Sequence, residues 1–173
     1  MKLSSRTILI TGGTSGIGLE LAKRLLGRGN TIIVTGRDAA KLEAIKAVFS
    51  DIHTFQSDVS DPTAIAALYT AVVARFPALD TLINNAGIMR NLDMNQQRDL
   101  DDVTREIEIN LNGPVRMVQQ FLPHLKAQPN ALLVNVSSGL AFVPLPISPV
   151  YSATKRRFTR SACRCGYNSK EAA

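Results

Sequence analysis

The sequence has few of the residues that build metal centres or disulfides. Its two cysteines, Cys163 and Cys165, lie two residues apart, a spacing that suits neither a mutual disulfide nor a complete zinc site. Its two histidines, His53 and His124, stand in no pattern of partners, and we interpret both as structural. We therefore expect no bound metal.

Long apolar runs are also absent. No stretch reaches the length that a membrane-spanning helix needs, and the N-terminus lacks the pattern of a signal peptide. We therefore expect a cytoplasmic protein without membrane contact. Its 173 residues fit one domain with a real core, and 45% hydrophobic and 20% charged residues are ordinary values for a globular chain.

The net charge of +6 is concentrated near the C-terminus. The segment Arg156–Ala173 carries +4, which leaves only +2 for the rest of the chain. Because the basic residues form no stripe across the fold, we expect no nucleic-acid partner, and a nucleic-acid binder acting through this segment is the least favoured function. The charged residues of the segment are Arg156, Arg157, Arg160, Arg164, Lys170 and Glu171.

Apolar, β-branched runs alternate with segments of helical period along the chain. This alternation predicts a parallel α/β sheet whose right-handed crossovers place helices on both faces, a three-layer, doubly wound fold. A ligand then belongs at the carboxyl ends of the strands, where the strand order reverses. Strands are predicted at 7–10, 31–35, 52–56, 79–84 and 131–137, and helices at about 17–26, 38–50, 61–73 and 100–125.

A glycine-rich stretch, Thr-Gly-Gly-Thr-Ser-Gly-Ile-Gly, lies between the first predicted strand and the first helix. Glycines let the backbone approach a pyrophosphate closely, and the helix N-terminus offers free N–H groups to the phosphates. In this position the stretch indicates a dinucleotide site, with the spacing Gly12-x-x-x-Gly16-x-Gly18 in place of the commoner G-x-G-x-x-G. Its candidate cofactor-binding residues are Gly12, Thr14, Ser15, Gly16, Ile17 and Gly18.

The end of the second predicted strand selects the nucleotide. An arginine there accommodates a 2′-phosphate, whereas an acidic residue binds the ribose 2′-hydroxyl. Arg37 therefore favours NADP, while Asp38 keeps NAD possible. In the alternative interpretation, Arg37 is a surface turn residue and Asp38 caps the following helix.

Three residues could carry proton chemistry. Tyr151 and Lys155 are four apart and share a face of a helix, and Ser138 falls at the carboxyl end of the fifth predicted strand. A free tyrosine keeps its proton up to a pH of roughly 10, and a nearby ammonium group favours the phenolate. Tyr151 could then give a proton to a carbonyl oxygen as hydride arrives, and Ser138, with Ser137 as its rival, could hydrogen-bond that oxygen.

Together with Asn-Asn-Ala-Gly at 84–87, these motifs resemble the short-chain dehydrogenase/reductase family, which has a Rossmann fold. The resemblance implies that Tyr151 is the acid/base, that Lys155 modulates it and binds the nicotinamide ribose, and that Ser138 polarises the carbonyl. It also implies cofactor contacts from Asn85, Ala86 and Gly87, and contacts of Asp58 and Val59 with the adenine ring. The two asparagine amides would tie the fourth strand to its neighbours. The alternative for Asp58 is a turn-forming residue.

Asn110 lies inside the long predicted helix, shortly before Pro114. Pro114 removes a helical hydrogen bond and should kink the helix nearby, which frees carbonyl groups that can hold water. The family resemblance implies that Asn110 belongs to a water-linked proton relay. The alternative is a polar residue on a solvated face.

The resemblance covers Thr7 to about Lys155 and then weakens, because Arg156 and Arg157 replace the small and apolar residues typical of the family. The family's last two strands are missing, so we expect an NAD(P)-binding domain over 1–155, a divergent basic tail over 156–173, and an exposed sheet edge. The tail is interpreted as an out-of-frame segment, since a one-base shift turns alanine codons into arginine codons. The alternative is a genuine short, basic C-terminus.

These observations predict an oxidoreductase that transfers hydride between NADP(H) and a carbonyl compound or secondary alcohol. The alternative is a truncated, catalytically impaired fragment that only binds the cofactor. The family resemblance implies a homodimer or homotetramer built through the long helix and the helix after Tyr151. Apolar residues of the proline-rich segment 140–149 would line the substrate mouth, or would simply pack that segment onto the core.

Overall fold

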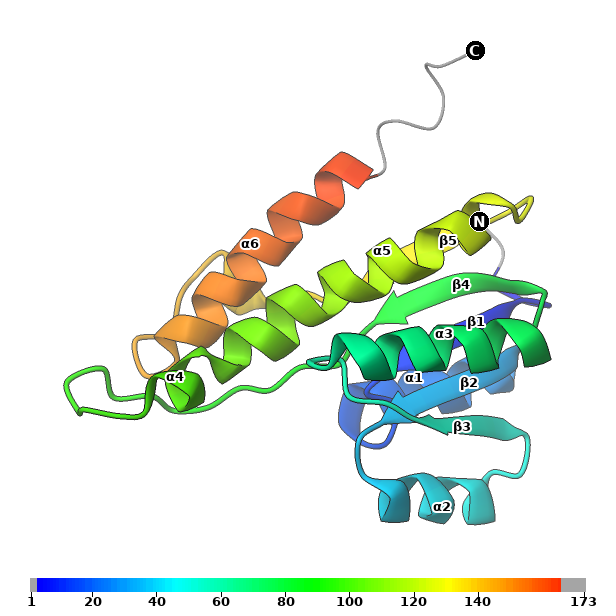
Figure 1. Ribbon diagram of the computed structural model, residues 1–173, viewed down its shortest axis with the longest axis horizontal. Coiled ribbons are helices and arrows are strands. Elements are labelled where there is room, and N and C mark those ends of the chain that lie inside the picture. Colours follow the sequence, from blue (N-terminus) through cyan, green and yellow to red (C-terminus); the bar gives the residue numbers. More distant parts are fainter. Residues whose placement is uncertain (1–2, 166–173) are drawn as a thin grey trace.

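The computed structural model describes residues 3–165, with side chains described up to residue 159. A five-stranded parallel sheet in the order β3-β2-β1-β4-β5 forms the middle of three layers (Figure 1). The strands are β1 (Thr7–Thr11), β2 (Thr31–Gly36), β3 (Ile52–Gln56), β4 (Leu79–Asn84) and β5 (Leu132–Asn135). The helices are α1 (Gly16–Leu26), α2 (Ala39–Val48), α3 (Pro62–Arg75), α4 (Leu100–Ile107), α5 (Gly113–Lys126) and α6 (Pro149–Cys165). The predicted fold class is confirmed.

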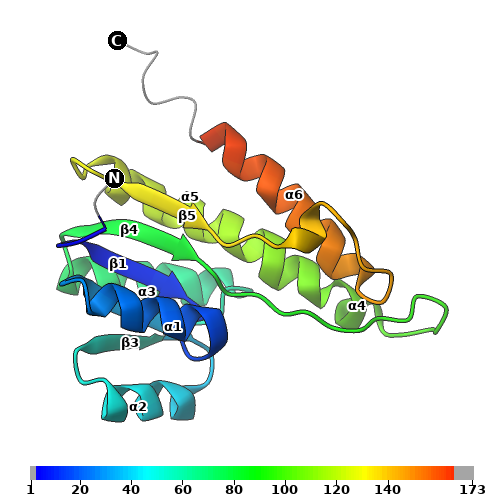
Figure 2. The ribbon, with the colours of Figure 1, turned by 180° about the vertical axis from the view of Figure 1, so that it is seen from behind.

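The two faces of the sheet bury two separate apolar clusters, because side chains of a strand point alternately to opposite faces. Ile8 and Ile10 of β1 pack with the buried residues of α1 and α2. Leu9, between them, packs with those of α3 and α5. Figure 2 shows α1 in front of the sheet and α3 behind it. The sheet is therefore covered on both sides, as a parallel sheet requires.

The long helix predicted over 100–125 is interrupted. Between α4 and α5 the chain forms a π-helical segment, η1 (Glu108–Asn112), and Pro114 lies in the first turn of α5. Next to Pro114, where the sequence predicts a kink, the structure has a π turn in place of regular α-helical hydrogen bonding. Asp99 fixes the start of α4, since its carboxylate accepts the backbone N–H groups of Asp101 and Asp102.

The described sheet has β5 at one edge, where all four of its residues are only half-buried. This strand is shorter than the predicted 131–137, and its end is followed by a short 3₁₀ turn, η2 (Gly139–Ala141). Helix α6 continues past Lys155, with Arg156 and Arg157 exposed. Residues 166–173 of the predicted tail lie outside the described residues, as do the side chains of Arg160, Cys163, Arg164 and Cys165.

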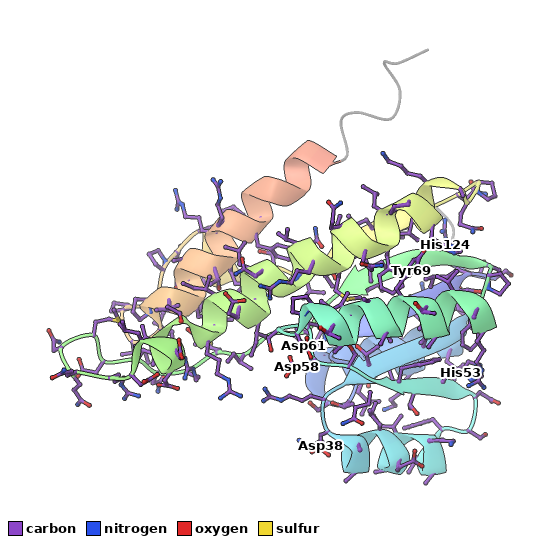
Figure 3. The ribbon with its side chains drawn as sticks, in the orientation of Figure 1. Asp38, His53, Asp58, Asp61, Tyr69 and His124 are labelled. Atoms are coloured by element: carbon purple, nitrogen blue, oxygen red, sulfur yellow. The ribbon has the colours of Figure 1, made fainter. Side chains whose placement is uncertain are left out.

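The two histidines lie at the opposite end of the sheet from Asp38, Asp58 and Asp61 (Figure 3). His124 bonds through Nε2 to the carbonyl oxygen of Leu79, and His53 packs against the ring of Phe76. Both contacts support a structural role. Within residues 3–165, no helix is both long and apolar enough to cross a bilayer.

Candidate active site

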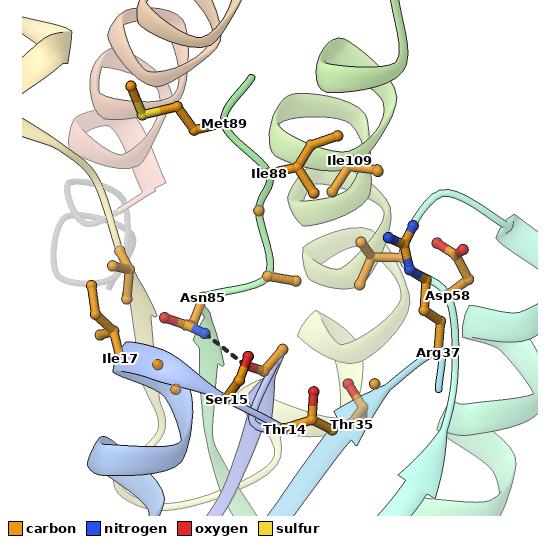
Figure 4. Close-up of a pocket in the computed structure, with 18 of the residues that line it drawn as sticks. Thr14, Ser15, Ile17, Thr35, Arg37, Asp58, Asn85, Ile88, Met89 and Ile109 are labelled. Atoms are coloured by element: carbon orange, nitrogen blue, oxygen red, sulfur yellow. Dashed lines mark hydrogen bonds between the residues drawn. The ribbon is translucent and has the colours of Figure 1, made fainter. Parts of the chain in front are cut away.

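A cavity of about 540 Å³ opens at the carboxyl ends of β1, β2 and β4 (Figure 4). This is the point where the strand order reverses, since β1 pairs with β2 on one side and with β4 on the other. Every residue predicted to bind the cofactor lines the cavity. They are Gly12, Thr14, Ser15, Gly16, Ile17, Gly18, Arg37, Asp58, Val59, Asn85, Ala86, Gly87, Tyr151 and Lys155.

The glycine-rich loop is shaped by two positions that exclude side chains. Gly12 has φ +66°, and a Cβ on Gly18 would stand 2.3 Å from the carbonyl oxygen of Gly12. Helix α1 begins at Gly16, and the Ser15 side chain makes no capping bond to it. The first-turn N–H groups of α1 are thus left without a side-chain cap at the cavity, an arrangement that suits a phosphate group.

Asn84 and Asn85 tie β4 to its two neighbours. Asn85, labelled in Figure 4, donates from Nδ2 to the carbonyl oxygens of Thr11 and Gly12 at 3.0 and 3.1 Å. On the other side, Asn84 Nδ2 donates to Oδ1 of Asn135 at 2.9 Å. The sequence prediction that the two amides link the fourth strand to its neighbours is confirmed, and Asn85 also holds the glycine-rich loop in place.

The opposite end of the cavity holds two basic side chains. Arg37 extends toward Asp58 in Figure 4, and Lys41 lines the cavity beside Asp38. Asp38 caps α2, since its Oδ1 accepts the Lys41 backbone N–H at 3.1 Å. Burial raises the pKa of Asp58, but two hydrogen bonds from Ser60 and the charges of Arg37 and Arg105 together hold it below its ordinary value.

Lys155 reaches the cavity from α6. Only 5% of the residue is exposed, its Nζ donates to the carbonyl oxygen of Val136 at 3.0 Å, and the same Nζ lies 5.7 Å from the centre of the Tyr151 ring. Burial lowers the pKa of Lys155. The predicted helical pair is thus brought together at one cavity wall, with the ammonium group close to the phenol ring.

The two neighbouring serines differ in position. Ser137 lines the cavity and its hydroxyl is bonded to that of Thr159. Ser138 does not line it among the described residues. Instead, its Oγ accepts the backbone N–H of Leu140 at 3.2 Å and caps η2. The assignment of the carbonyl-polarising role to Ser138 stays a prediction.

Asn110 is buried in η1, with 1% of the residue exposed, and it lies behind the cavity wall. Its Oδ1 accepts the Ile88 N–H at 2.9 Å, and its Nδ2 donates to the Ile88 carbonyl at 2.8 Å. It reaches close to Lys155 across Gly87, since a Cβ on Gly87 would stand 3.2 Å from Asn110 Oδ1 and 3.7 Å from Lys155 Nζ. The relay role of Asn110 stays a prediction.

Several lining residues were not anticipated from the sequence. Ile88 and Met89 follow the Asn-Asn-Ala-Gly motif directly, and Ile109 comes from η1. Lys41, in the first turn of α2, is a further basic residue at the Arg37 end of the cavity. In the sequence, only their closeness to the recognised motifs could have indicated that these residues line the cavity, because isoleucine, methionine and lysine are common beside strands and in helices.

A family model described as short chain dehydrogenase matches residues 6–164, and so continues beyond Lys155. An uncharacterized oxidoreductase, DltE, of Bacillus subtilis (strain 168) is 48% identical over 90% of this chain, which spans 62% of that protein's length. The 3-oxoacyl-[acyl-carrier-protein] reductase FabG of Staphylococcus aureus (strain MW2) is 34% identical over 95% of this chain and 69% of its own.

Solved structures show the same relationship. ElxO with NADP bound matches with a TM-score of 0.82 and 28% identity, over 91% of this chain and 65% of its own. The 3-ketoacyl-(acyl-carrier-protein) reductase from Brucella melitensis complexed with NADH matches with a TM-score of 0.86 and 27% identity, over 95% and 70%. With the family model matching nearly all of the described residues, the chain belongs to the short-chain dehydrogenase family.

Proposed function

We propose that this protein is an oxidoreductase that transfers hydride between NADP(H) and a carbonyl compound or secondary alcohol. The observation that carries the proposal is the presence of Tyr151 and Lys155 in the same cavity as the glycine-rich loop. A dinucleotide with its phosphates at α1 is long enough to place its reactive ring at the far wall of a cavity of this size.

The residues present fit a nicotinamide dinucleotide. The uncapped first turn of α1 and the open space beside Gly16 suit the phosphates, and a bound nicotinamide would supply the hydride. The Tyr151 hydroxyl would give its proton to the carbonyl oxygen in reduction and take it back in oxidation. Lys155 would favour the phenolate through its charge. Ser138 is the serine predicted to hydrogen-bond the same oxygen, and its rival Ser137 is the one that lines the cavity.

Two observations support NADP over NAD. Arg37 and Lys41 give two positive charges to one end of the cavity, which suits the 2′-phosphate. The Asp38 carboxylate, which could otherwise bind a ribose hydroxyl, is already engaged in capping α2. Among similar structures, ElxO has NADP bound and the Brucella melitensis reductase has NADH, so relatives of both kinds exist.

Exposed apolar side chains at the cavity support an apolar substrate. Ile17 and Met89 line it and are 66% and 49% exposed. Binding a ligand with an apolar body would cover both. The assembly as a homodimer or homotetramer, the cytoplasmic location and the division of the chain at residue 155 remain predictions, of which light scattering in solution would test the first.

The proposal is tested by titrating the protein with NADPH while following cofactor fluorescence, and then by adding a panel of apolar aldehydes and ketones and following NADPH absorbance. We expect saturable binding and oxidation of NADPH that depends on the carbonyl compound. A folded protein that binds no NADPH at millimolar concentration would refute the proposal. Binding without any turnover on the panel would favour the cofactor-binding fragment instead.

A further inference from the structure

The segment that follows Asn-Asn-Ala-Gly, residues 88–92, is a strap anchored at every second residue. Ile88 is held by the Asn110 side chain through both its backbone N–H and its carbonyl group. The Arg90 N–H donates to Oε1 of Glu106 at 2.7 Å, and the Arg90 carbonyl accepts the Ser148 hydroxyl at 3.0 Å. The Leu92 N–H then donates to the Ile147 carbonyl at 3.0 Å.

Glu106 is the unusual member of this arrangement. It lies in α4 and is fully buried, with 0% of the residue exposed. Its Oε1 stands 3.9 Å from Arg90 Nε, while the rest of the Arg90 guanidinium bonds to Asp102. Burying a carboxylate is costly, and an apolar side chain of similar volume would pack here without that cost. The carboxylate therefore calls for a role beyond filling space.

The strap held by Glu106 also bonds to the start of α6, because the Arg90 carbonyl accepts the hydroxyl of Ser148, the residue just before that helix. Burial raises the pKa of Glu106, while the Arg90 backbone N–H, the Arg90 guanidinium and the backbone N–H of Tyr151 each act to lower it. Oε2 is buried and has no hydrogen-bond partner among the described residues. One buried carboxylate thus holds the strap at the residue that also bonds to the start of α6.

Asn110, four residues further along, makes a parallel link. It joins Ile88 of the strap to Thr154 of α6, with 3.4 Å between its Nδ2 and Thr154 Oγ1. Glu106 holds Arg90, two residues further along the strap, and Arg90 bonds in turn to Ser148, the residue before α6. Asn110 and Glu106 therefore both help to hold residues 88–92 against α6, at two successive places along the strap.

We propose that Glu106 is a positioning residue that fixes the first turn of α6, and with it the Tyr151 phenol, against the strap that lines the cavity. The expected effect of Glu106 on the reaction rate rests on the proposed reductase function. Its expected role in fixing α6 does not. The glycine-rich loop lies on β1 and α1, away from this brace. Loss of the brace should therefore misplace the proton donor and leave cofactor binding unchanged.

Amide hydrogen exchange tests the structural part directly. Glu106→Gln keeps the shape but replaces one carboxylate oxygen by an NH₂ donor and removes the negative charge, so it favours the Arg90 and Tyr151 N–H groups less than the carboxylate does. We expect at least one of these two amides to exchange about tenfold faster than in the parent, and both to do so in Glu106→Ala. Unchanged exchange at both amides in folded Glu106→Gln would overturn the proposal, even if Glu106→Ala does not fold.

The matched control is Glu108→Gln, two residues along in η1. Glu108 bonds to Arg116 at 2.9 Å and to Asn112 at 2.7 Å, and neither contact reaches the strap. Exchange at Arg90 and Tyr151 should match the parent in this variant. If Glu108→Gln accelerates both amides as much as Glu106→Gln does, general loosening of the helix explains the effect and the positioning role is wrong.

Kinetics test the catalytic part. In Glu106→Ala we expect kcat for carbonyl reduction to fall roughly tenfold to hundredfold while NADPH affinity stays at the parent value, with partial rescue of kcat in Glu106→Gln. An unchanged kcat, or an equal loss of NADPH affinity, would overturn the positioning role. A parent protein that reduces no carbonyl compound would refute the proposed function alone, because the exchange measurement still decides the role of Glu106.

Discussion

The ammonium group of Lys155 donates a 3.0 Å hydrogen bond to the carbonyl oxygen of Val136, the residue that follows β5. This contact ties α6 to the end of the sheet and holds a buried positive charge 5.7 Å from the centre of the Tyr151 ring. Helix α6 packs mainly on α4, η1 and η2, so this bond also fixes the helix relative to β5.

The burial of this charge predicts a pH dependence of stability. Because burial lowers the pKa of Lys155 below the ordinary 10.5, the unfolded chain binds more protons than the folded chain between the two values. The free energy of unfolding of the parent, relative to that of Lys155→Met, should therefore rise as the pH increases through this window. Urea unfolding at a series of alkaline pH values measures it, and a relative stability that falls with pH would contradict the prediction.

Replacement of Tyr151 by phenylalanine keeps the ring and removes the transferable proton. We expect carbonyl reduction to fall by roughly 10²–10⁴-fold, the usual worth of one positioned acid, with NADPH affinity nearly unchanged. Steady-state rates and a fluorescence titration measure the two quantities. Lys155→Ala is the matched comparison, because it should weaken both. A near-parental rate in Tyr151→Phe would remove Tyr151 from the mechanism.

The charge at the Arg37 end of the cavity should select the nucleotide. Arg37→Ala should weaken NADPH much more than NADH, because only NADPH carries the 2′-phosphate that a guanidinium can bind in bidentate fashion. Lys41→Ala should act in the same direction with a smaller effect, since its ammonium is a single point charge. Dissociation constants for both nucleotides measure this. Equal losses for NADPH and NADH in Arg37→Ala would show that the residue does not select.

Gly18 should tolerate no side chain. A methyl group there would stand 2.3 Å from the Gly12 carbonyl oxygen and 2.4 Å from Asn85 Nδ2, both of which hold the loop. We expect Gly18→Ala to weaken NADPH binding more than tenfold and to lower stability by about 1–3 kcal/mol, the usual cost of forced overpacking. Gly29→Ala is the control. A Cβ on Gly29 would meet nothing within 4 Å, so this variant introduces only the backbone strain that a φ of +74° imposes on alanine.

The fold could be read from the sequence where local chemistry is distinctive. The β-branched run at β2 and the Gly12–Gly18 spacing each require a particular backbone, and both are confirmed. The residues of the candidate cofactor site could also be predicted, because their motifs occupy strand ends that a parallel sheet brings together. Their joint presence in one cavity bears out that logic, while the individual roles of Ser138 and Asn110 stay predictions.

Other features depend on tertiary packing that no local pattern reveals. The π turn at Glu108–Asn112 keeps the apolar spacing of a helix, so the sequence shows only the Pro114 that follows it. Glu106 sits in a charged helical turn, whose residues usually face water, and only the docking of the strap buries it. Ser137 and Ser138 are adjacent at a strand end, where one residue of register reverses the direction of a side chain.

All four strand pairings in the described sheet are parallel, and this has a consequence for how the chain folds. No pairing can start from a tight hairpin, since each needs a crossover that closes a long loop. Thr7 pairs with Thr31 and also with Leu79, so the β1–β4 junction closes far more chain than the β1–β2 junction. The cavity proposed to hold the nucleotide straddles that junction. Added cofactor should therefore slow unfolding without speeding the early steps of folding, because its binding surface exists only after the longest loop has closed.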